Sequence, residues 1–230
     1  AEREFYSFQA VKTERLGAAS GLEQVSCGYR HTLLWNKNSN ELFVCGDNHC
    51  GQLGVGEELA NQLPTFTKCL DLTSPSPQVL SGRHSVPIKQ IFAGWYHSEV
   101  LFSDGVLFTC GSNSHGEMGV ANLPEKNHYH FRQVNMLSSN VVIDRLCMTS
   151  PTGSTMALLK DTHNTKNNTI VVSGLNHHYQ LGLGDRAHRN DLTKVPQSTF
   201  MDLEQEEFVH VAHGSRISVI VIARKSTSKA

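Results

Sequence analysis

The chain has no marked excess of charge of either sign. Its 230 residues include 20 Lys and Arg and 21 Asp and Glu, which leaves a formal net charge of -1. Proteins dedicated to binding polyanions carry a surplus of Lys and Arg, because contacts to phosphate need positive charge. We therefore expect no direct binding of nucleic acid.

Long apolar runs are also absent. The longest are short, such as residues 219–223, whereas a membrane-spanning helix needs about 20 apolar residues. The N-terminus shows no basic segment followed by a long apolar core, so no secretory signal is predicted. The six cysteines do not form the pattern of a small disulfide-rich domain. We expect a cytoplasmic or nuclear protein without membrane contact.

The short motifs of common catalytic sites are missing as well. The chain contains no G-x-S-x-G, no Walker A motif and no H-E-x-x-H. Its glycine-rich segments look like phosphate-binding loops, but the residues that follow them are polar and rich in glycine rather than helical. The sequence therefore predicts no catalytic residue, no cofactor, no small-molecule substrate and a protein that is not an enzyme.

Metal-ligand spacing is missing too, although the chain has 13 histidines. The close pairs are His49/Cys50, His128/His130 and His177/His178. Zinc sites typically combine two pairs such as C-x2-C and H-x3-5-H, and neither spacing occurs. Cys45 and Cys50 have C-x4-C spacing without a matching second pair. Spacing alone thus predicts no metal site.

What the chain does have is one segment that occurs three times. The copies are residues 46–56 (GDNHCGQLGVG), 111–119 (GSNSHGEMG) and 174–184 (GLNHHYQLGLG). Their first glycines stand 65 and then 63 residues apart, and such a fixed period indicates a repeat architecture. Three copies favour a turn that each unit requires, in which glycine supplies a positive φ.

A second shared segment precedes each of these copies. An apolar run, a glycine turn and another apolar run occupy residues 25–35 and 91–101, with partial copies at 147–159 and 209–223. The turn reads G-x-x-H-S/T at 28–32 and 94–98, while Pro151/Ser154 and Gly214/Ile217 stand at its glycine and histidine positions in the later copies. Asp104-Gly105 between apolar runs predicts a hairpin. Short apolar runs separated by turns predict an all-β chain.

These two motifs resemble the repeats of the RCC1-like β-propeller family, the regulator of chromosome condensation type. The resemblance extends over residues 5–223, and two well-kept copies of each motif carry it. It implies an all-β, RCC1-like propeller with about four recognisable units. It also implies a non-enzymatic module or regulatory subunit that binds a protein partner, such as a small GTPase. The alternative is a guanine-nucleotide exchange factor for a small GTPase.

The chain ends carry parts of one further unit. Residues 5–17 hold a degraded glycine motif with Gln9 at the first glycine, and residues 209–223 hold a strand–glycine–strand half. Joining them would close a ring and remove its open strand edges. We expect a single domain over residues 1–230, closed in this way or part of a larger propeller. Residues 224–230 are expected to be a disordered tail.

The repeated positions and the variable positions predict different roles. The expected structural positions are Gly28, His31, Gly46, Gly54, Gly94, His97, Gly111, Gly119, Gly174, Gly182 and Gly214. Recurrence of the histidine indicates a structural task, such as bonding a backbone carbonyl within its own unit.

The two variable residues inside each G-x-x-H turn are the candidate partner-binding residues. In a ring these turns gather at one end, and aromatic and Arg side chains are enriched at binding hot spots. The predicted residues are Tyr29, Arg30, Trp95, Tyr96 and Arg216. The alternative is that Trp95 and Tyr96 pack between units. The long connections at 57–88 and 120–140 are a second candidate surface.

Overall fold

The protein is built from antiparallel sheets. The computed structural model describes residues 21–56, 61–70, 86–121, 123, 125–135, 140–149, 151–163, 168–202 and 205–224. These residues form three four-stranded sheets and one two-stranded sheet. The degraded motif at 5–17 and the tail beyond residue 224 lie outside the described residues. No helix among the described residues has the length and hydropathy that crossing a membrane requires.

Each four-stranded sheet follows the order of the chain and is called a blade here. Blade 1 contains β1 (Leu22–Cys27), β2 (His31–Asn36), β3 (Glu41–Asp47) and β4 (Gln62–Leu70). Blade 2 contains β5 (Ile88–Ala93), β6 (His97–Phe102), β7 (Leu107–Ser112) and β8 (Asn127–Gln133). Blade 3 contains β9 (Val141–Leu146), β10 (Ser154–Asp161), β11 (Asn168–Gly174) and β12 (Arg189–Lys194). The half-blade contains β13 (Glu206–His213) and β14 (Ser218–Arg224), preceded by the short 3-10 helix η2 (Gln197–Thr199).

The glycine motif forms the loop between the third and fourth strands of each blade. Its glycines adopt positive φ at Gly46, Gly54, Gly111, Gly119, Gly174 and Gly182. At Gly46 the φ is 105°, and a Cβ would overlap the backbone of Arg30 and His31. Only glycine combines that dihedral with so close an approach, which explains its recurrence. The predicted hairpin between β6 and β7 is confirmed, with Gly105 at φ 82°.

The core lies between the blades. One buried cluster joins blades 1 and 2, and a larger one joins blades 2 and 3 and the half-blade. Strands β6 and β7 are buried at all six positions, because blade 2 is covered on both faces. The buried positions include polar residues as well as apolar ones, among them His97, Ser98 and Glu99 at the start of β6.

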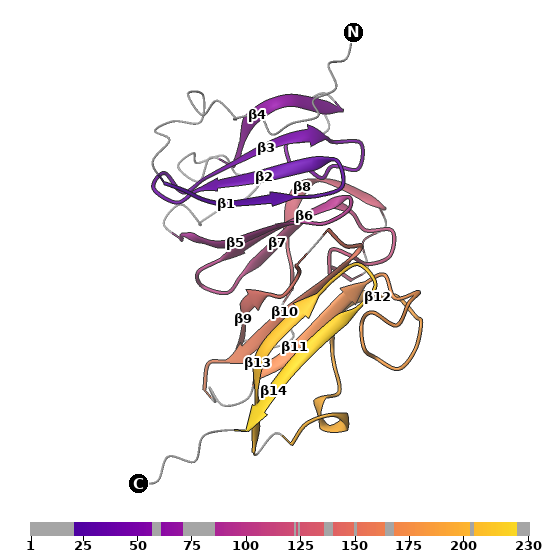
Figure 1. The fold of residues 1–230 in the computed structure, drawn as a ribbon. Helices are drawn as coiled ribbons and strands as arrows, with labels where there is room; N and C mark the ends of the chain where they lie inside the picture. Colours follow the sequence, from indigo (N-terminus) through magenta and orange to yellow (C-terminus); the bar gives the residue numbers. More distant parts are fainter. Residues whose placement is uncertain are drawn as a thin grey trace, which may run out of the picture.

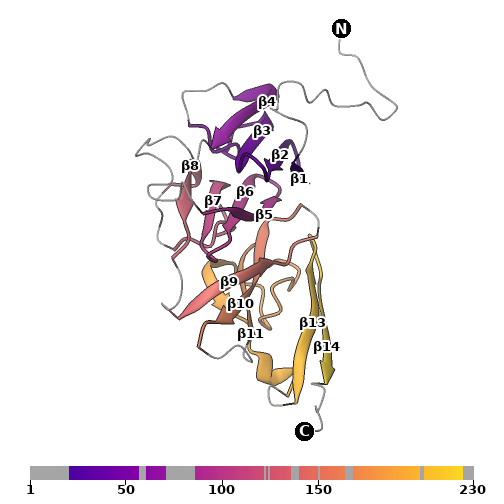
Figure 2. The same cartoon turned by 90° about the vertical axis from the view of Figure 1, so that its left-hand side faces the viewer.

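The blades follow one another in an open arc (Figures 1 and 2). Blade 1 lies at one end and blade 3 with the half-blade lies at the other, so the described residues do not close a ring. Within the described residues β14 pairs only with β13. Of the two expected architectures, the structure has that of part of a larger propeller.

Candidate functional site

The turns that precede the second strand of each unit form a row. The backbone N–H of Tyr29 donates to the carbonyl of Gly94 at 3.3 Å, and that of Trp95 donates to Thr152 at 2.9 Å. The half-blade continues the row, since the N–H of His213 donates to Cys147 at 2.8 Å. The structure thus brings turns from successive units side by side.

Three of the predicted partner-binding residues form one exposed cluster, which we call the Tyr–Arg cluster: Tyr29, Arg30 and Tyr96. The two tyrosine rings meet edge to face, with centroids 5.6 Å apart at 71°. The Arg30 guanidinium lies 5.4 Å from the centroid of Tyr29. The side chains of Tyr29 and Tyr96 are 59% and 37% exposed. Aromatic pairs and cation–π contacts hold such side chains in a defined shape without burying them.

The other two predicted residues behave differently. Trp95 is half-buried, and its ring lies about 3.1 Å from the place of a Cβ on Gly153 in the next turn. It therefore packs between units, as the alternative for this residue predicted. Arg216 is exposed in the turn of the half-blade, farther along the row from the Tyr–Arg cluster.

The recurrent histidines lie between blades. A Cβ on Gly28 would overlap the imidazole of His31, which explains why the turn pairs glycine with histidine. The Nε2 of His31 lies 2.9 Å from the Oγ of Ser98 in blade 2. The expected partner, a backbone carbonyl of the same unit, is thus corrected to a hydroxyl of the next blade. Burial, followed by the nearby His97, lowers the pKa of His31 to about 4.

A row of hydroxyls that the sequence reasoning missed joins each unit to the next. Ser98 Oγ donates to the carbonyl of Gln52 at 2.5 Å, and Ser218 Oγ donates to that of Gln180 at 2.5 Å. Thr155 Oγ1 donates likewise to the carbonyl of Glu117 at 2.7 Å. The signal in the sequence was the Ser or Thr that follows the histidine position in every copy.

At the junction of blade 3 and the half-blade, the motif position has no histidine, and a histidine from another strand supplies the imidazole. Ser154 stands at the histidine position, and its Oγ lies 2.6 Å from Nε2 of His213. The Nδ1 of His213 lies 2.7 Å from Oγ of Ser218. Burial lowers the pKa of His213 to about 4. The loss of the motif histidine is therefore offset by the residue that ends β13, directly before Gly214.

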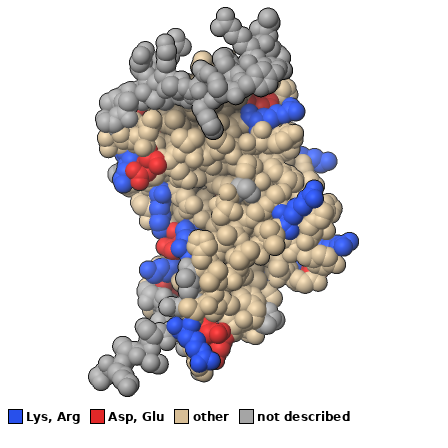
Figure 3. Space-filling model, viewed as in Figure 1, with Lys and Arg blue, Asp and Glu red and all other residues tan. Residues whose placement is uncertain are grey.

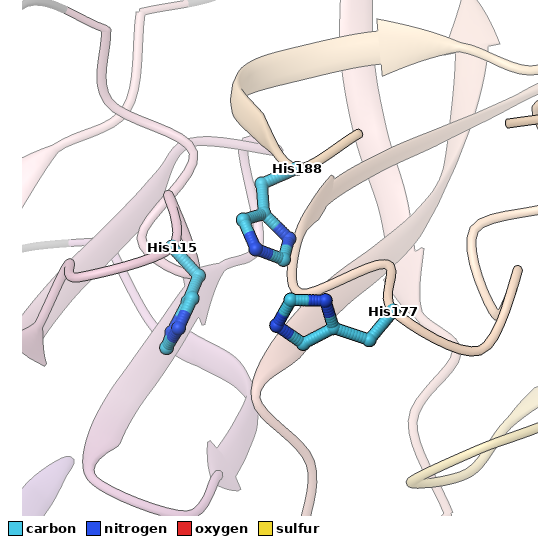
Figure 4. A group of neighbouring side chains, drawn as sticks. All are labelled: His115, His177 and His188. Carbon is cyan, nitrogen blue, oxygen red and sulfur yellow. The ribbon is translucent and has the colours of Figure 1, made fainter. Parts of the chain in front are cut away.

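The three close pairs weighed as metal ligands do not come together. His49 instead contacts Asp47 in its own loop. However, His177 lies beside His115 and His188, which are 62 and 11 residues away along the chain (Figure 4). Ligand spacing within short windows misses such a group, because its members come from two loops in different blades and are far apart along the chain.

Comparison with known proteins identifies the repeats. A model described as the regulator of chromosome condensation (RCC1) repeat matches residues 23–52 and 88–117. A second model of the same description matches residues 39–101. The chain is an RCC1-repeat protein. The matches lie in blades 1 and 2, where the G-x-x-H turn is intact, and the altered turn at Pro151 falls outside them.

Relatives of the RCC1-repeat chain are longer than the chain itself. The probable E3 ubiquitin-protein ligase HERC4 of Homo sapiens is 30% identical over 172 residues, which are 75% of the chain and 14% of the relative. The secretion-regulating guanine nucleotide exchange factor of Mus musculus is 32% identical over 47% of the chain and 20% of its own length. The chain thus spans only a small part of these curated relatives.

The fold of a solved RCC1-type structure agrees with the arc of blades. The crystal structure of Prp20p from Saccharomyces cerevisiae superposes with a TM-score of 0.67 at 21% identity. It covers 90% of the chain, whereas the chain covers 44% of Prp20p. The predicted RCC1-like propeller fold is confirmed, as an arc that corresponds to less than half of such a propeller.

One functional expectation is corrected by these relatives. The sequence predicted a protein that is not an enzyme, yet HERC4, matched over 75% of the chain, is named as a ligase. Absence of catalytic motifs within one repeat region says nothing about the activity of the longer proteins in which such a region occurs. The expectation of a non-enzymatic protein is therefore wrong.

Proposed function

We propose that the arc is a protein-binding module with a regulatory role, and that the Tyr–Arg cluster contacts the partner. The observation that carries the proposal is the exposed Tyr29–Tyr96 pair with Arg30 beside it. Tyr and Arg side chains supply large contact areas and dominate binding hot spots. Two blades contribute to the cluster, so its shape depends on the packed arc.

Charge and cysteine chemistry support a protein partner inside the cell. Figure 3 shows charged side chains of both signs scattered over the face that carries β13 and β14, without a basic patch on that face. Nucleic-acid binding needs such a patch. All six cysteines are unpaired, which suits the reducing cytoplasm or nucleus. Prp20p is described as binding Gsp1p and histones, and we propose a protein partner for this chain also.

The proposal is tested by affinity capture from a cell extract with quantitative mass spectrometry. Tyr29→Ala/Tyr96→Ala is expected to reduce recovery of the specific partners at least tenfold, or about 1.4 kcal/mol of binding free energy. Tyr179→Ala is the matched control. Tyr179 is 50% exposed and carries its own cation–π contact, with Arg186 at 4.8 Å. Equal partner recovery with both variants would remove the cluster from the interface.

A second candidate function is guanine-nucleotide exchange on a small GTPase. The observation that favours it is the name of the mouse relative, a guanine nucleotide exchange factor. Exchange needs no covalent chemistry from the module, since the catalyst only has to bind the GTPase in its open state more tightly than in its closed one. Release of a fluorescent nucleotide from a panel of small GTPases separates the two functions. Accelerated release with one member, lost in Tyr29→Ala/Tyr96→Ala, is the expected result for exchange.

A further inference from the structure

Three imidazoles from neighbouring blades face one another at the junction of blades 2 and 3 (Figure 4). His115 lies in the loop after β7, His177 lies in the loop after β11, and His188 directly precedes β12. The ring centroids are 4.4 Å apart for His177–His188, 4.9 Å for His115–His188 and 6.2 Å for His115–His177. One nitrogen of each ring lies within 4.8 Å of a nitrogen of each of the others.

We propose that these three histidines, the His triad, bind a divalent transition-metal ion, with zinc as the first candidate. Imidazole is a good ligand for zinc, copper and nickel, and three histidines with a water in the fourth position make a common zinc site. Nitrogens at zinc-ligand distance lie about 3.3 Å from one another in a tetrahedral site. The three nitrogens now lie within 4.8 Å of one another. Rotation of the exposed His177 ring and of the His115 and His188 rings would bring them to the shorter distance.

A buried carboxylate lies beside the first ligand. Glu117 is only 5% exposed, and its Oε1 lies 3.6 Å from Nδ1 of His115. The carboxylate is held in place by Ser112 Oγ at 3.0 Å and by the N–H of His115 at 2.6 Å. A turn of the His115 ring that lets Nδ1 donate to this carboxylate would keep the proton on Nδ1, leave Nε2 to the metal and raise its basicity.

The second ligand exchanges one hydrogen bond for the metal. Nδ1 of His188 accepts a hydrogen bond from the N–H of Asn176 at 3.1 Å, so the neutral ring carries its proton on Nε2. A half-turn of the ring carries Nδ1 away from that amide and allows the proton to reside there, so that Nε2 becomes a ligand. Burial, followed by His115 and His177, lowers the pKa of His188. An imidazole must be neutral to bind a metal.

The His triad is not a requirement of the repeat. Gly51 and Gly116 occupy equivalent positions at the two junctions. A Cβ on Gly51 would overlap the backbone of β8, and a Cβ on Gly116 would overlap that of β12. Strand pairing aligns these blades as well, with Gly111 opposite His128 and Gly174 opposite Arg189. At the junction of blades 1 and 2 the positions of the triad are held by Cys50, Ser114 and Asn127. A fold requirement would repeat at both junctions, so the histidines are specific to this one.

The test is metal binding by the full chain, without an affinity tag and freed of metal by a chelator. Calorimetric titration with zinc at pH 7 is expected to show one ion per chain. Titration with cobalt is expected to give the visible absorption of tetrahedral cobalt. His115→Asn and His177→Asn should each weaken zinc binding at least tenfold. His178→Asn, at an exposed histidine of the same loop, should bind as the unchanged chain does.

A second measurement separates ligand loss from unfolding. Zinc is expected to raise the melting temperature of the unchanged chain and of His178→Asn, but not that of His177→Asn. The metal-free melting temperatures should agree, because the His177 side chain is exposed and contributes little to packing. Absence of stoichiometric zinc binding by the unchanged chain, or an equal loss in His178→Asn, would overturn the proposal.

Discussion

His31 and His213 do the same work at two different junctions of the arc. Each imidazole is buried and bonded to a serine hydroxyl of the neighbouring unit, His31 to Ser98 and His213 to Ser154. Burial is the main cause of the low pKa of both rings, about 4 in each case. Neutral histidines thus fill polar gaps between blades, where burial disfavours the charged form of the ring.

These pKa values predict how acid affects stability. The unfolded chain binds a proton at each ring near the ordinary pKa of 6.5, whereas the folded chain does so only near 4. The free energy of unfolding should therefore fall as the pH drops from 6.5 to 4, by up to roughly 1.4 kcal/mol per pH unit for each ring. Urea unfolding followed by circular dichroism at pH 7, 6 and 5 measures this fall. His213→Gln should show a shallower pH dependence of the free energy of unfolding. His163→Gln, at an exposed histidine, should show the same pH dependence as the unchanged chain.

At the scale of the strand, burial depends on how many neighbours a blade has. Strands β6 and β7 are buried throughout because blades cover both faces of blade 2. In β14, Val219 and Val221 are 50% and 45% exposed, while Ile220 packs on the core. An apolar, half-paired edge strand is a site for association with another chain or another part of the same protein.

The exposed edge predicts self-association of the chain. Val219→Lys/Val221→Lys should reduce it, because two charges on the exposed face oppose pairing of one edge with another. Sedimentation velocity over a range of concentrations measures the effect. Asn190→Lys, at an exposed position of β12, adds charge without removing an apolar side chain and should sediment as the unchanged chain does. The same monomer fraction for all three proteins would contradict the prediction.

In the part of the chain that the structure describes, the blades form a short linear array in which successive blades share a core. The half-blade bonds to blade 3 through His213 and buries Val211 against the shared core. Blade 1 instead shares its core with blade 2. Stability in such arrays is close to a sum of units and nearest-neighbour interfaces.

This organisation predicts that removal of one unit destabilises the adjacent blade and leaves distant blades little changed. Truncation after Asp202, which removes β13 and β14, should speed amide hydrogen exchange in β10 by roughly tenfold or more, since its buried neighbours are lost. Exchange in β2, two interfaces away, should change little. Exchange measured by mass spectrometry on proteolytic fragments resolves the two strands. Equal acceleration in both would show that the arc unfolds as one cooperative body.

The sequence by itself determined the unit of this protein. Recurrent glycines mark positions such as Gly46 and Gly111, both at φ 105°, where a side chain would strain the backbone and overlap the preceding turn. That requirement is local and identical in each copy, so it leaves a periodic signal that predicts the all-β fold and the RCC1 family. The pairing of Gly28 with His31 is a similar local rule.

Only the tertiary structure decided what the units do together. The open arc depends on how many blades a ring needs, which no single repeat encodes. The Tyr29–Tyr96 contact and the His triad join residues from different repeats, across the packing of one blade on the next. The replacement of a motif histidine by His213 is likewise invisible along the chain. Such groups form because blade packing fixes the distance between loops, and that packing is a property of the assembled sheets.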